Sequence, residues 1–165
     1  MIRLLLDRIE VGPTLLSRLN RHIHESSSPN KFITLLLAEL EPVAGTLRYI
    51  NAGHNPGLLV RAGGEVETLG VGGLPLGLLA GAAYREDCRT LGPGDLVCLY
   101  SDGITEAVSP GDEEFSLDRL GGLLARHRTR PLDEMLERID GALAEFTGGL
   151  AQGDDQTLVL VRREA

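Results

Sequence analysis

Acidic residues lie at the ends of two apolar segments of this sequence. Asp102 follows the apolar run LVCLY (residues 96–100), and Asp154 and Asp155 precede the apolar run in QTLVLV (residues 156–161). If these runs are neighbouring antiparallel strands, the end of the first lies beside the start of the second, and Asp102 and Asp154 converge at one sheet edge. Hard cations such as Mg²⁺ and Mn²⁺ prefer carboxylate oxygens and water in near-octahedral geometry. The pattern therefore predicts half of a metal site.

Both acidic motifs also have simpler interpretations. Asp-Gly is a common turn dipeptide, because Asp is a favoured turn residue and Gly lets the backbone turn tightly, so Asp102 and Gly103 alone are compatible with a plain turn. The pair Asp154 and Asp155 is less ordinary, because like charges repel and strands disfavour Asp. Residue pattern alone leaves three alternatives open: a turn, a cap at the strand entrance, or a metal site.

A histidine in the segment YINAGHNPG raises a second question. His54 lies between Gly53 and Asn55 at a turn after a predicted strand. A histidine at such a turn can serve as a metal ligand or an acid-base group, but a loop histidine held by hydrogen bonds is the more common case. The remaining histidines lie in predicted helices without companion ligands, where packing at a surface or edge explains them: His22, His24 and His127. The sequence contains no catalytic-triad motif, P-loop or zinc-ligand spacing.

The composition is that of one globular domain. With 165 residues and 42% apolar residues, the chain is long enough for one domain with a real core and too short for two comfortable ones. Aromatic residues make up only 4% and Trp is absent, so Leu, Val, Ile and Ala must build the core. The net charge of −8 argues against a nucleic-acid-binding protein and suits divalent cations or basic partners.

The two cysteines and the apolar start favour a cytoplasmic protein. Cys88 and Cys98 lack the spacing of a disulfide framework; a bond between them stays open, but thiols packed in strands are the default interpretation. No apolar run is long enough to span a membrane. The opening MIRLLLDRIEV is broken by Asp7 and lacks a cleavage-site pattern, so we expect no signal peptide and no membrane partner.

The periodicity of apolar residues changes along the chain and predicts an α+β protein. Gly12-Pro13 favours a helix start, and apolar residues at helical spacing continue to about His24. Alternating and continuous apolar runs then predict strands over residues 32–40, 45–53, 57–62, 65–70, 82–91, 95–100 and 156–164, with a Gly-rich loop over 70–79. Two helices are expected over 117–127 and 132–146, the second closed by Gly148. Strands in one block with helices before and after indicate antiparallel sheets covered by helices, not alternating βαβ units.

Taken together, the motifs resemble a known family. FITLLLAEL, GTLRYINAGHNPGLLV, GGLPLG, LGPGDLVCLYSDGITEA and QGDDQTLVLV occur in the order found in the C-terminal two thirds of a SpoIIE-like phosphatase domain. This is the bacterial branch of the metal-dependent, PPM-type serine/threonine protein phosphatases. The resemblance runs from about Phe32 to Arg162, and the helix at Leu15–His24 also fits. Each motif is weak alone, but the ordered series is specific.

The resemblance implies a fold and a chemistry. It implies a β-sandwich of antiparallel sheets with helices packed outside each sheet, in α-β-β-α layers. It also implies a centre of two Mn²⁺ or Mg²⁺ ions at one edge of the sandwich. The metals would activate a bridging water that attacks a phosphoserine or phosphothreonine directly, without a covalent enzyme intermediate.

The same resemblance assigns roles to individual residues. Asp102 of the SDG motif and Asp154 of the GDD motif would be metal ligands, with Gly103 beside the first. Asp155 would give adjacent support, through hydrogen bonds or as an occasional ligand. The remaining candidates would form a loop that borders the metal edge: Asn51, Gly53 and His54. For His54 the resemblance favours a shaping role over direct catalysis, so no side chain is expected to act chemically beyond the metal-activated water.

This sequence departs from the family pattern at its start. Family members carry an earlier Gly-Asp motif and a further Asp-containing strand, whereas the first acidic residue here is Asp7, inside the opening apolar segment. We therefore expect residues 1–165 to be a single SpoIIE-like domain that is incomplete at the N-terminus and has weak or no activity alone. Missing strands would expose sheet edges and apolar faces, so we also expect dimerisation, strand exchange or marginal stability.

The resemblance implies partners in bacterial signalling. The substrate would be a phosphorylated protein of the STAS type, an anti-sigma-factor antagonist in a partner-switching pathway that regulates a sigma factor. In relatives, an upstream sensory domain such as PAS, GAF or a receiver controls the phosphatase. The alternative is a non-catalytic, phosphatase-like interaction module that binds a regulatory partner. The missing aspartates favour this alternative, and the two intact acidic motifs weigh against it.

Overall fold

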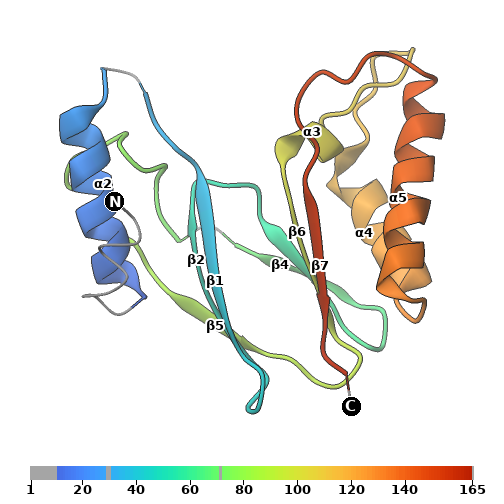
Figure 1. Cartoon of the computed structure of the whole chain (residues 1–165), viewed down its shortest axis with the longest axis horizontal. Helices are drawn as coiled ribbons and strands as arrows, with labels where there is room; N and C mark the ends of the chain where they lie inside the picture. Colours follow the sequence, from blue (N-terminus) through green and yellow to red (C-terminus); the bar gives the residue numbers. More distant parts are fainter. Residues whose placement is uncertain (1–10, 29–30, 71, 165) are drawn as a thin grey trace. The chain divides into compact units, whose positions relative to one another are not determined.

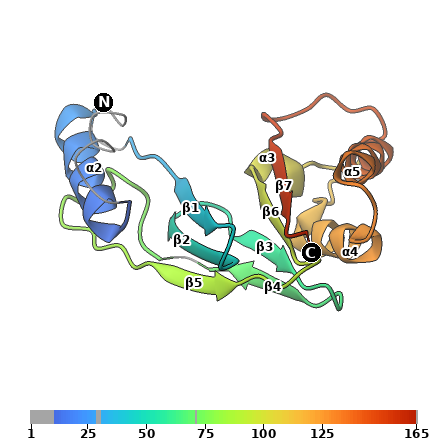
Figure 2. The same ribbon diagram turned by 60° about the horizontal axis from the view of Figure 1, so that its bottom comes forward.

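Helix α2 (Pro13–Ser26) packs on the first of two antiparallel sheets. The computed structural model describes residues 11–28, 31–70 and 72–164. By contacts, the chain divides into one unit of Met1–Pro56 and Leu69–Thr90 and a second of Gly57–Thr68 and Leu91–Ala165. Figures 1 and 2 label the elements of both units. The predicted opening segment, with Asp7, lies outside the described residues.

The helix of the first unit forms as the sequence predicts. Pro13 occupies the first turn, where its missing N–H is not needed for helix hydrogen bonding. Leu15, Leu16 and Leu19 are buried along one face. The helix continues to Ser26, two residues beyond the predicted end at His24.

Three strands form the sheet of the first unit: β1 (Leu35–Glu41), β2 (Thr46–Ala52) and β5 (Asp87–Thr90), in the order β1-β2-β5. Both pairs are antiparallel, and the predicted hairpin between β1 and β2 is confirmed. The predicted first strand began at Phe32, but Phe32 and Ile33 are exposed, and Ile33 instead forms an isolated bridge with Leu76. Likewise, only the last part of the predicted strand 82–91 pairs, as β5.

The Gly-rich segment 72–81 is a loop, as predicted, and α2 holds it in place. The buried Asn20 donates from Nδ2 to the carbonyl oxygens of Leu79 (2.9 Å) and Ala80 (3.1 Å). Its Oδ1 accepts a hydrogen bond from the amide of Gly77 at 2.8 Å, where the backbone has φ 87°. Asn20 therefore pairs with three backbone groups of the loop, of which the carbonyl oxygen of Leu79 also accepts a hydrogen bond from the amide of Ala82 at 3.0 Å.

The second unit contains a four-stranded sheet in the order β4-β3-β6-β7. Its strands are β3 (Gly57–Val60), β4 (Val66–Leu69), β6 (Leu96–Tyr100) and β7 (Leu158–Arg162). Strands β6 and β7 are antiparallel neighbours, which confirms the pairing on which the predicted metal edge depends. The register places Tyr100 opposite Leu158, at the end of β6 and the start of β7.

Helices α3 (Asp102–Thr105), α4 (Ser116–His127) and α5 (Leu132–Thr147) belong to the same unit. Leu58 and Cys98 of the sheet share one apolar core with Leu120 and Leu124 of α4 and Ile139 of α5. Helix α5 ends as predicted, with Gly148 in the left-handed region at φ 58°. Each sheet therefore carries a helical layer of its own unit, and the α+β prediction with two antiparallel sheets is confirmed.

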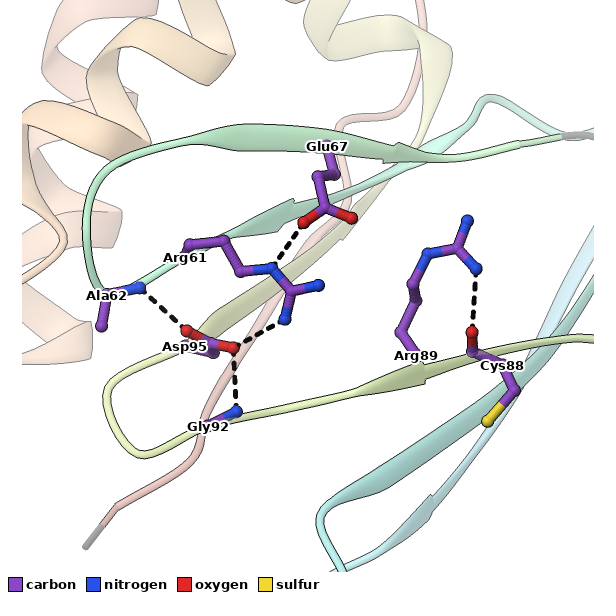
Figure 3. A network of polar contacts seen from close by, with 7 residues as sticks. All are labelled: Arg61, Ala62, Glu67, Cys88, Arg89, Gly92 and Asp95. Carbon is purple, nitrogen blue, oxygen red and sulfur yellow. Dashed lines mark hydrogen bonds and ion pairs between the residues drawn. The ribbon is translucent and has the colours of Figure 1, made fainter.

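A buried carboxylate organises the turn before β6. Asp95 is only 5% exposed and accepts hydrogen bonds from the amides of Gly92 (2.9 Å) and Ala62 (2.8 Å) and from Nη1 of Arg61 (2.9 Å). Arg61 also donates to Glu67 on β4 (Figure 3). Burial raises the pKa of Asp95, but these hydrogen bonds and the Arg61 charge outweigh it and hold the pKa below its ordinary value. The network joins the β3–β4 hairpin to the turn at residues 92–95.

Among the described residues, no helix combines the length and the apolar character that a membrane crossing requires.

Candidate metal site

Ser101 connects the end of β6 to the loop that carries Asp154 and Asp155. Its amide donates to the carbonyl oxygen of Thr157 at 3.0 Å, which continues the β6–β7 pairing by one step. Its hydroxyl donates to the carbonyl oxygen of Asp155 (2.8 Å) and accepts from the amide of Thr157 (2.9 Å). One serine side chain thus ties both acidic motifs to the same end of the sheet.

Asp102 begins the short helix α3 and is exposed. Its Oδ1 accepts a hydrogen bond from the amide of Gly103 at 3.0 Å, and its carbonyl oxygen accepts from the amide of Glu106 at 2.8 Å. The Asp-Gly dipeptide therefore starts a helical turn and does not form an isolated β-turn. The second carboxylate oxygen of Asp102 makes no hydrogen bond within the described part of the chain.

Gly103 lets the two acidic motifs touch. A Cβ added at Gly103 would lie 2.6 Å from the carbonyl oxygen of Asp155 and 3.0 Å from that of Asp154. Gln156 closes the contact, since its Nε2 donates to the carbonyl oxygen of Gly103 at 3.0 Å. The φ of Gly103 is not positive, so the position requires glycine for space and not for backbone conformation.

Asp154 and Asp155 lie in an exposed loop that precedes β7 by several residues. The Oδ1 of Asp154 accepts a hydrogen bond from the amide of Asp155 at 2.7 Å, and the carbonyl oxygen of Asp154 accepts from Nε2 of Gln152 at 2.7 Å. Because both carboxylates face water, their mutual repulsion is screened. Asp154, like Asp102, uses one carboxylate oxygen in a local turn and leaves the other without a hydrogen bond in the described chain.

A cavity of about 330 Å³ lies beside this edge. Gly103 of α3 and Glu106, directly after α3, line it together with Asp154 and Gln156 from the loop before β7. The rest of the wall comes from the segment after α3 and from the end of α5 with the segment that follows it: Ala107, Val108, Thr147, Ala151, Gln152 and Gly153. Carboxylate and amide groups therefore form part of the wall of a space that Asp154, one of the candidate ligands, lines.

The donor set fits a hydrated hard cation. Mg²⁺ and Mn²⁺ bind oxygen, and Mg²⁺ in particular keeps several waters while one or two carboxylates hold it. Asp102 and Asp154 can supply such carboxylates from adjoining backbone segments. Within residues 11–28, 31–70 and 72–164, no group of three His, Cys, Asp or Glu side chains could hold a metal ion. The described residues thus fit two ligands of an open, water-rich site and do not form a closed cage.

The other predicted loop belongs to the first unit, and hydrogen bonds shape it. The buried Asn51 accepts a hydrogen bond at Oδ1 from the amide of His54 at 2.8 Å. Gly53 has φ 69°, and a Cβ there would collide with Pro75. The ring Nδ1 of His54 lies 3.1 Å from Oγ1 of Thr34. His54 is therefore a hydrogen-bonded loop histidine, and its place at the border of a metal site stays a prediction.

Neither cysteine forms a disulfide; Cys88 is exposed and Cys98 is buried.

Sequence reasoning did not identify Ser101 or Gln156. The only sequence signal for Ser101 is its place directly before Asp102. Gln156 gives no signal, because its partner Gly103 is distant in the chain.

Two antiparallel sheets, each with helices of its own unit, match the PP2C-like fold. The sequence matches the family Stage II sporulation protein E (SpoIIE) over residues 1–164, and the chain belongs to this family.

Individual relatives agree with this assignment. The chain is 29% identical over 153 residues to phosphoserine phosphatase RsbU of Bacillus subtilis, which covers 91% of this chain and 44% of RsbU. The chain spans less than half the length of the curated relatives it matches.

Solved structures share the fold. The SiaA-PP2C domain of Pseudomonas aeruginosa superposes with a TM-score of 0.85 at 22% identity, covering 98% of this chain and 65% of that one. RsbX, whose structure was solved in complex with magnesium, gives a TM-score of 0.62 at 16% identity over 96% of this chain and 69% of its own. At such low identity these likenesses show the fold alone.

Proposed function

We propose that residues 1–165 form a SpoIIE-like phosphatase domain that hydrolyses phosphoserine or phosphothreonine on a protein. The observation that carries the proposal is the contact of the two acidic motifs at one end of β6 and β7. Gly103 lies against the backbone of Asp154 and Asp155, and Ser101 links both segments. Two aspartates distant in the chain are thereby held at the same edge, each with a carboxylate oxygen available.

In this proposal Asp102 and Asp154 hold a divalent cation, Mn²⁺ or Mg²⁺, and Asp155 supports Asp154. When bound, the metal would supply a water of lowered pKa as the nucleophile. Asp102 and Asp154 would hold their outward carboxylate oxygens toward the cation, while the local amide hydrogen bonds fix the orientation of each side chain. Asn51, Gly53 and His54 would shape the border of the site.

The substrate in this proposal is a phosphorylated protein, an anti-sigma-factor antagonist of the STAS type, in the bacterial cytoplasm. The relative RsbU is by name a phosphoserine phosphatase, which supports a phosphorylated serine as the target. Control by an upstream sensory domain belongs to the same proposal.

A second candidate is a non-catalytic module that binds its phosphorylated partner without hydrolysis. The observation in its favour is that the described residues bring together no third acidic or histidine ligand. For the same reason we expect slow turnover, or none, from this chain alone.

The proposal is tested by Mn²⁺ titration of the chain, followed by calorimetry, and by hydrolysis of p-nitrophenyl phosphate and a phosphoserine peptide. We expect the chain to bind Mn²⁺ weakly, and we expect Asp102→Asn and Asp154→Asn each to abolish this binding. The matched control is Asp118→Asn, which changes an exposed aspartate on α4 and should leave Mn²⁺ binding unchanged. Binding with slow turnover supports the enzyme, and phosphopeptide binding without hydrolysis supports the second candidate. Metal binding that survives both substitutions contradicts the proposed ligands.

We also propose that the chain self-associates. In the described sheet, β7 is an edge strand, and its Val159 and Val161 are 46% and 37% exposed. Size-exclusion chromatography with light scattering tests this, and a clean monomer of high thermal stability contradicts it.

A further inference from the structure

A second cavity, of about 420 Å³, continues the one beside the candidate metal edge. Helix α5 lines it with residues spaced by three and four: Asp140, Leu143, Ala144 and Thr147. The segment between α5 and β7 lines its other side with Leu150, Gln152 and Gln156 (Figure 1). The two cavities share Thr147, Gln152 and Gln156, so they form one groove, which we call the α5 groove. Asp154, a candidate metal ligand, lines one end of it.

The length of the α5 groove matches a short extended peptide. Asp140 and Thr147 are seven positions apart on α5, which at a rise of 1.5 Å per residue is about 10 Å along the helix axis. An extended chain advances about 3.3 Å per residue, so about three residues span this distance. A peptide with its phosphorylated residue beside Asp154 would therefore place a residue three or four positions away at Asp140.

The unused hydrogen-bonding groups of the groove are acceptors. The Nε2 of Gln152 donates to the carbonyl oxygen of Asp154 at 2.7 Å, and the Nε2 of Gln156 donates to that of Gly103 at 3.0 Å. The Oε1 of each glutamine accepts no hydrogen bond within the described chain. These bonds also hold the segment before β7 in place, so the groove presents fixed acceptors to a ligand that carries N–H groups.

The charge of the groove is negative and is not compensated. Its lining carries the carboxylates of Glu106, Asp140 and Asp154, and in the described part of the chain no Lys, Arg or His lines either cavity. None of the three carboxylates belongs to an ion pair of the described residues, whereas Glu113 and Glu134 each pair with an arginine. A cation in the groove would therefore meet carboxylates that have no competing partner in the described chain.

The fold itself does not require the carboxylate of Asp140. Asp140 is exposed in the middle of α5 (Leu132–Thr147), so it neither caps the helix nor offsets its dipole, both of which act at the terminal turns. Its side chain makes no hydrogen bond within the described residues. Apolar surface lies near it, because Leu143 is 5% exposed at the floor of the groove and Leu150 is 49% exposed at its side.

We propose that the α5 groove binds a Lys or Arg side chain of the phosphorylated substrate protein, three or four residues from the phosphorylated residue, and that Asp140 determines this specificity. The inference rests on the proposed phosphatase function and adds a charge preference to it. The cationic group would pair with Asp140, while its aliphatic stem covers Leu143 and Leu150. Backbone N–H groups of the substrate would donate to the Oε1 atoms of Gln152 and Gln156.

The test measures binding of labelled peptides to the full chain by fluorescence polarisation, with and without saturating Mn²⁺. All peptides have a central serine in an Ala-rich sequence. The first is phosphorylated and carries Lys three and four residues away on both sides, the second is phosphorylated with Glu at those positions, and the third is the Lys peptide without phosphate. Asp140→Lys reverses the charge of the groove. Glu145→Lys is the matched control, because it makes the same charge change at an exposed α5 residue that lines neither cavity.

We expect the phosphorylated Lys peptide to bind more tightly than the Glu peptide. Asp140→Lys should weaken binding of the Lys peptide about tenfold, because one exposed ion pair is lost and a repulsion of similar size is added. Glu145→Lys should weaken it less than about twofold, since the exposed charge is screened at a distance. Asp140→Lys should also improve binding of the Glu peptide about fivefold, which loss of folding could not do. Equal effects of the two substitutions, or no preference between the peptides, would overturn the proposal.

Failure of this proposal and failure of the proposed function give different results. Mn²⁺-dependent binding of both phosphopeptides that Asp140→Lys leaves unchanged would overturn the role of the groove and leave the proposed function standing. Binding of the Lys peptide that needs neither phosphate nor Mn²⁺ would contradict a phosphorylated substrate, and with it the proposed function. Selection of a basic side chain by Asp140 would stand in that case only if Asp140→Lys still weakened binding.

Discussion

Substitution of Gly103 by alanine probes the contact that brings the two acidic motifs together. A Cβ at this position would lie 2.6 Å from the carbonyl oxygen of Asp155, whereas ordinary contact begins at 3.4 Å. The difference, 3.4 − 2.6, means that backbone must move by about 0.8 Å. The obstacle is main chain and not a flexible side-chain end, so a rotamer change cannot relieve it. Gly103→Ala must therefore push α3 away from the loop before β7.

The loss of stability expected for Gly103→Ala has two causes: overpacking at the contact, and strain in the hydrogen bonds that cross it. Overpacking in a closely packed site costs about 1–3 kcal/mol. The bond from Gln156 to the carbonyl oxygen of Gly103 and the bond from Ser101 to Asp155 are both strained by the shift. Alanine regains up to about 1 kcal/mol of helix propensity in α3. We therefore expect Gly103→Ala to lower the free energy of unfolding by about 1–2 kcal/mol and to weaken Mn²⁺ binding.

Urea denaturation followed by circular dichroism measures the first effect, and Mn²⁺ titration measures the second. The matched control is Gly122→Ala, also a helical glycine but with open space at its Cβ. It should raise the free energy of unfolding by about 0.5–1 kcal/mol. If Gly103→Ala proves as stable as Gly122→Ala, the close contact between α3 and the loop is refuted.

Three further outcomes are expected. Asp95→Asn should destabilise the protein by about 2–4 kcal/mol by urea denaturation, because it weakens the bond with Arg61 and two amide bonds. The pKa of Asp95 in the folded protein lies below the ordinary value of 3.8. Its contribution to the free energy of unfolding is therefore fully present above pH 3.8 and is lost as the pH falls through the folded pKa, and the Asp95→Asn variant should lack this acid dependence. Tyr84→Phe should raise the unfolding free energy by about 1 kcal/mol in the same assay, because the buried Tyr84 hydroxyl has no hydrogen-bond partner among the residues that the structure describes; a loss of stability would show that the hydroxyl is satisfied. Burial raises the pKa of Cys98 to about 12, so a thiol reagent at pH 8 should modify only the exposed Cys88 rapidly, and Cys88→Ser should abolish the fast reaction.

The sequence was sufficient to predict β6, β7, α4 and α5, but not the short helix α3 that begins at Asp102. The apolar runs around Cys98 and Leu160 predicted two strands, and their antiparallel pairing is confirmed. Helical spacing of leucines predicted α4 and α5, and Gly148 ends α5 in the expected conformation. These features depend on local periodicity and capping, which a single sequence records.

The parts that could not be predicted depend on contacts between distant residues. Asn20 looks like one polar residue on an amphipathic helix, but it is buried because the loop at Gly77 needs its side chain. Phe32 has the apolar character of a strand residue, yet it lies before β1 and is 54% exposed. Strand boundaries follow the register of the partner strand, and Ser101 and Gln156 gain their roles only when β6 and β7 meet.

The central claim is that Asp102 and Asp154 together bind a divalent cation. Its most direct test is an anomalous difference map from crystals of the chain soaked in Mn²⁺. The account predicts one peak within about 2.0–2.4 Å of a carboxylate oxygen of each aspartate, at the junction of α3 and the loop before β7. A peak bound to neither residue, or a map without any peak at saturating Mn²⁺, would contradict it.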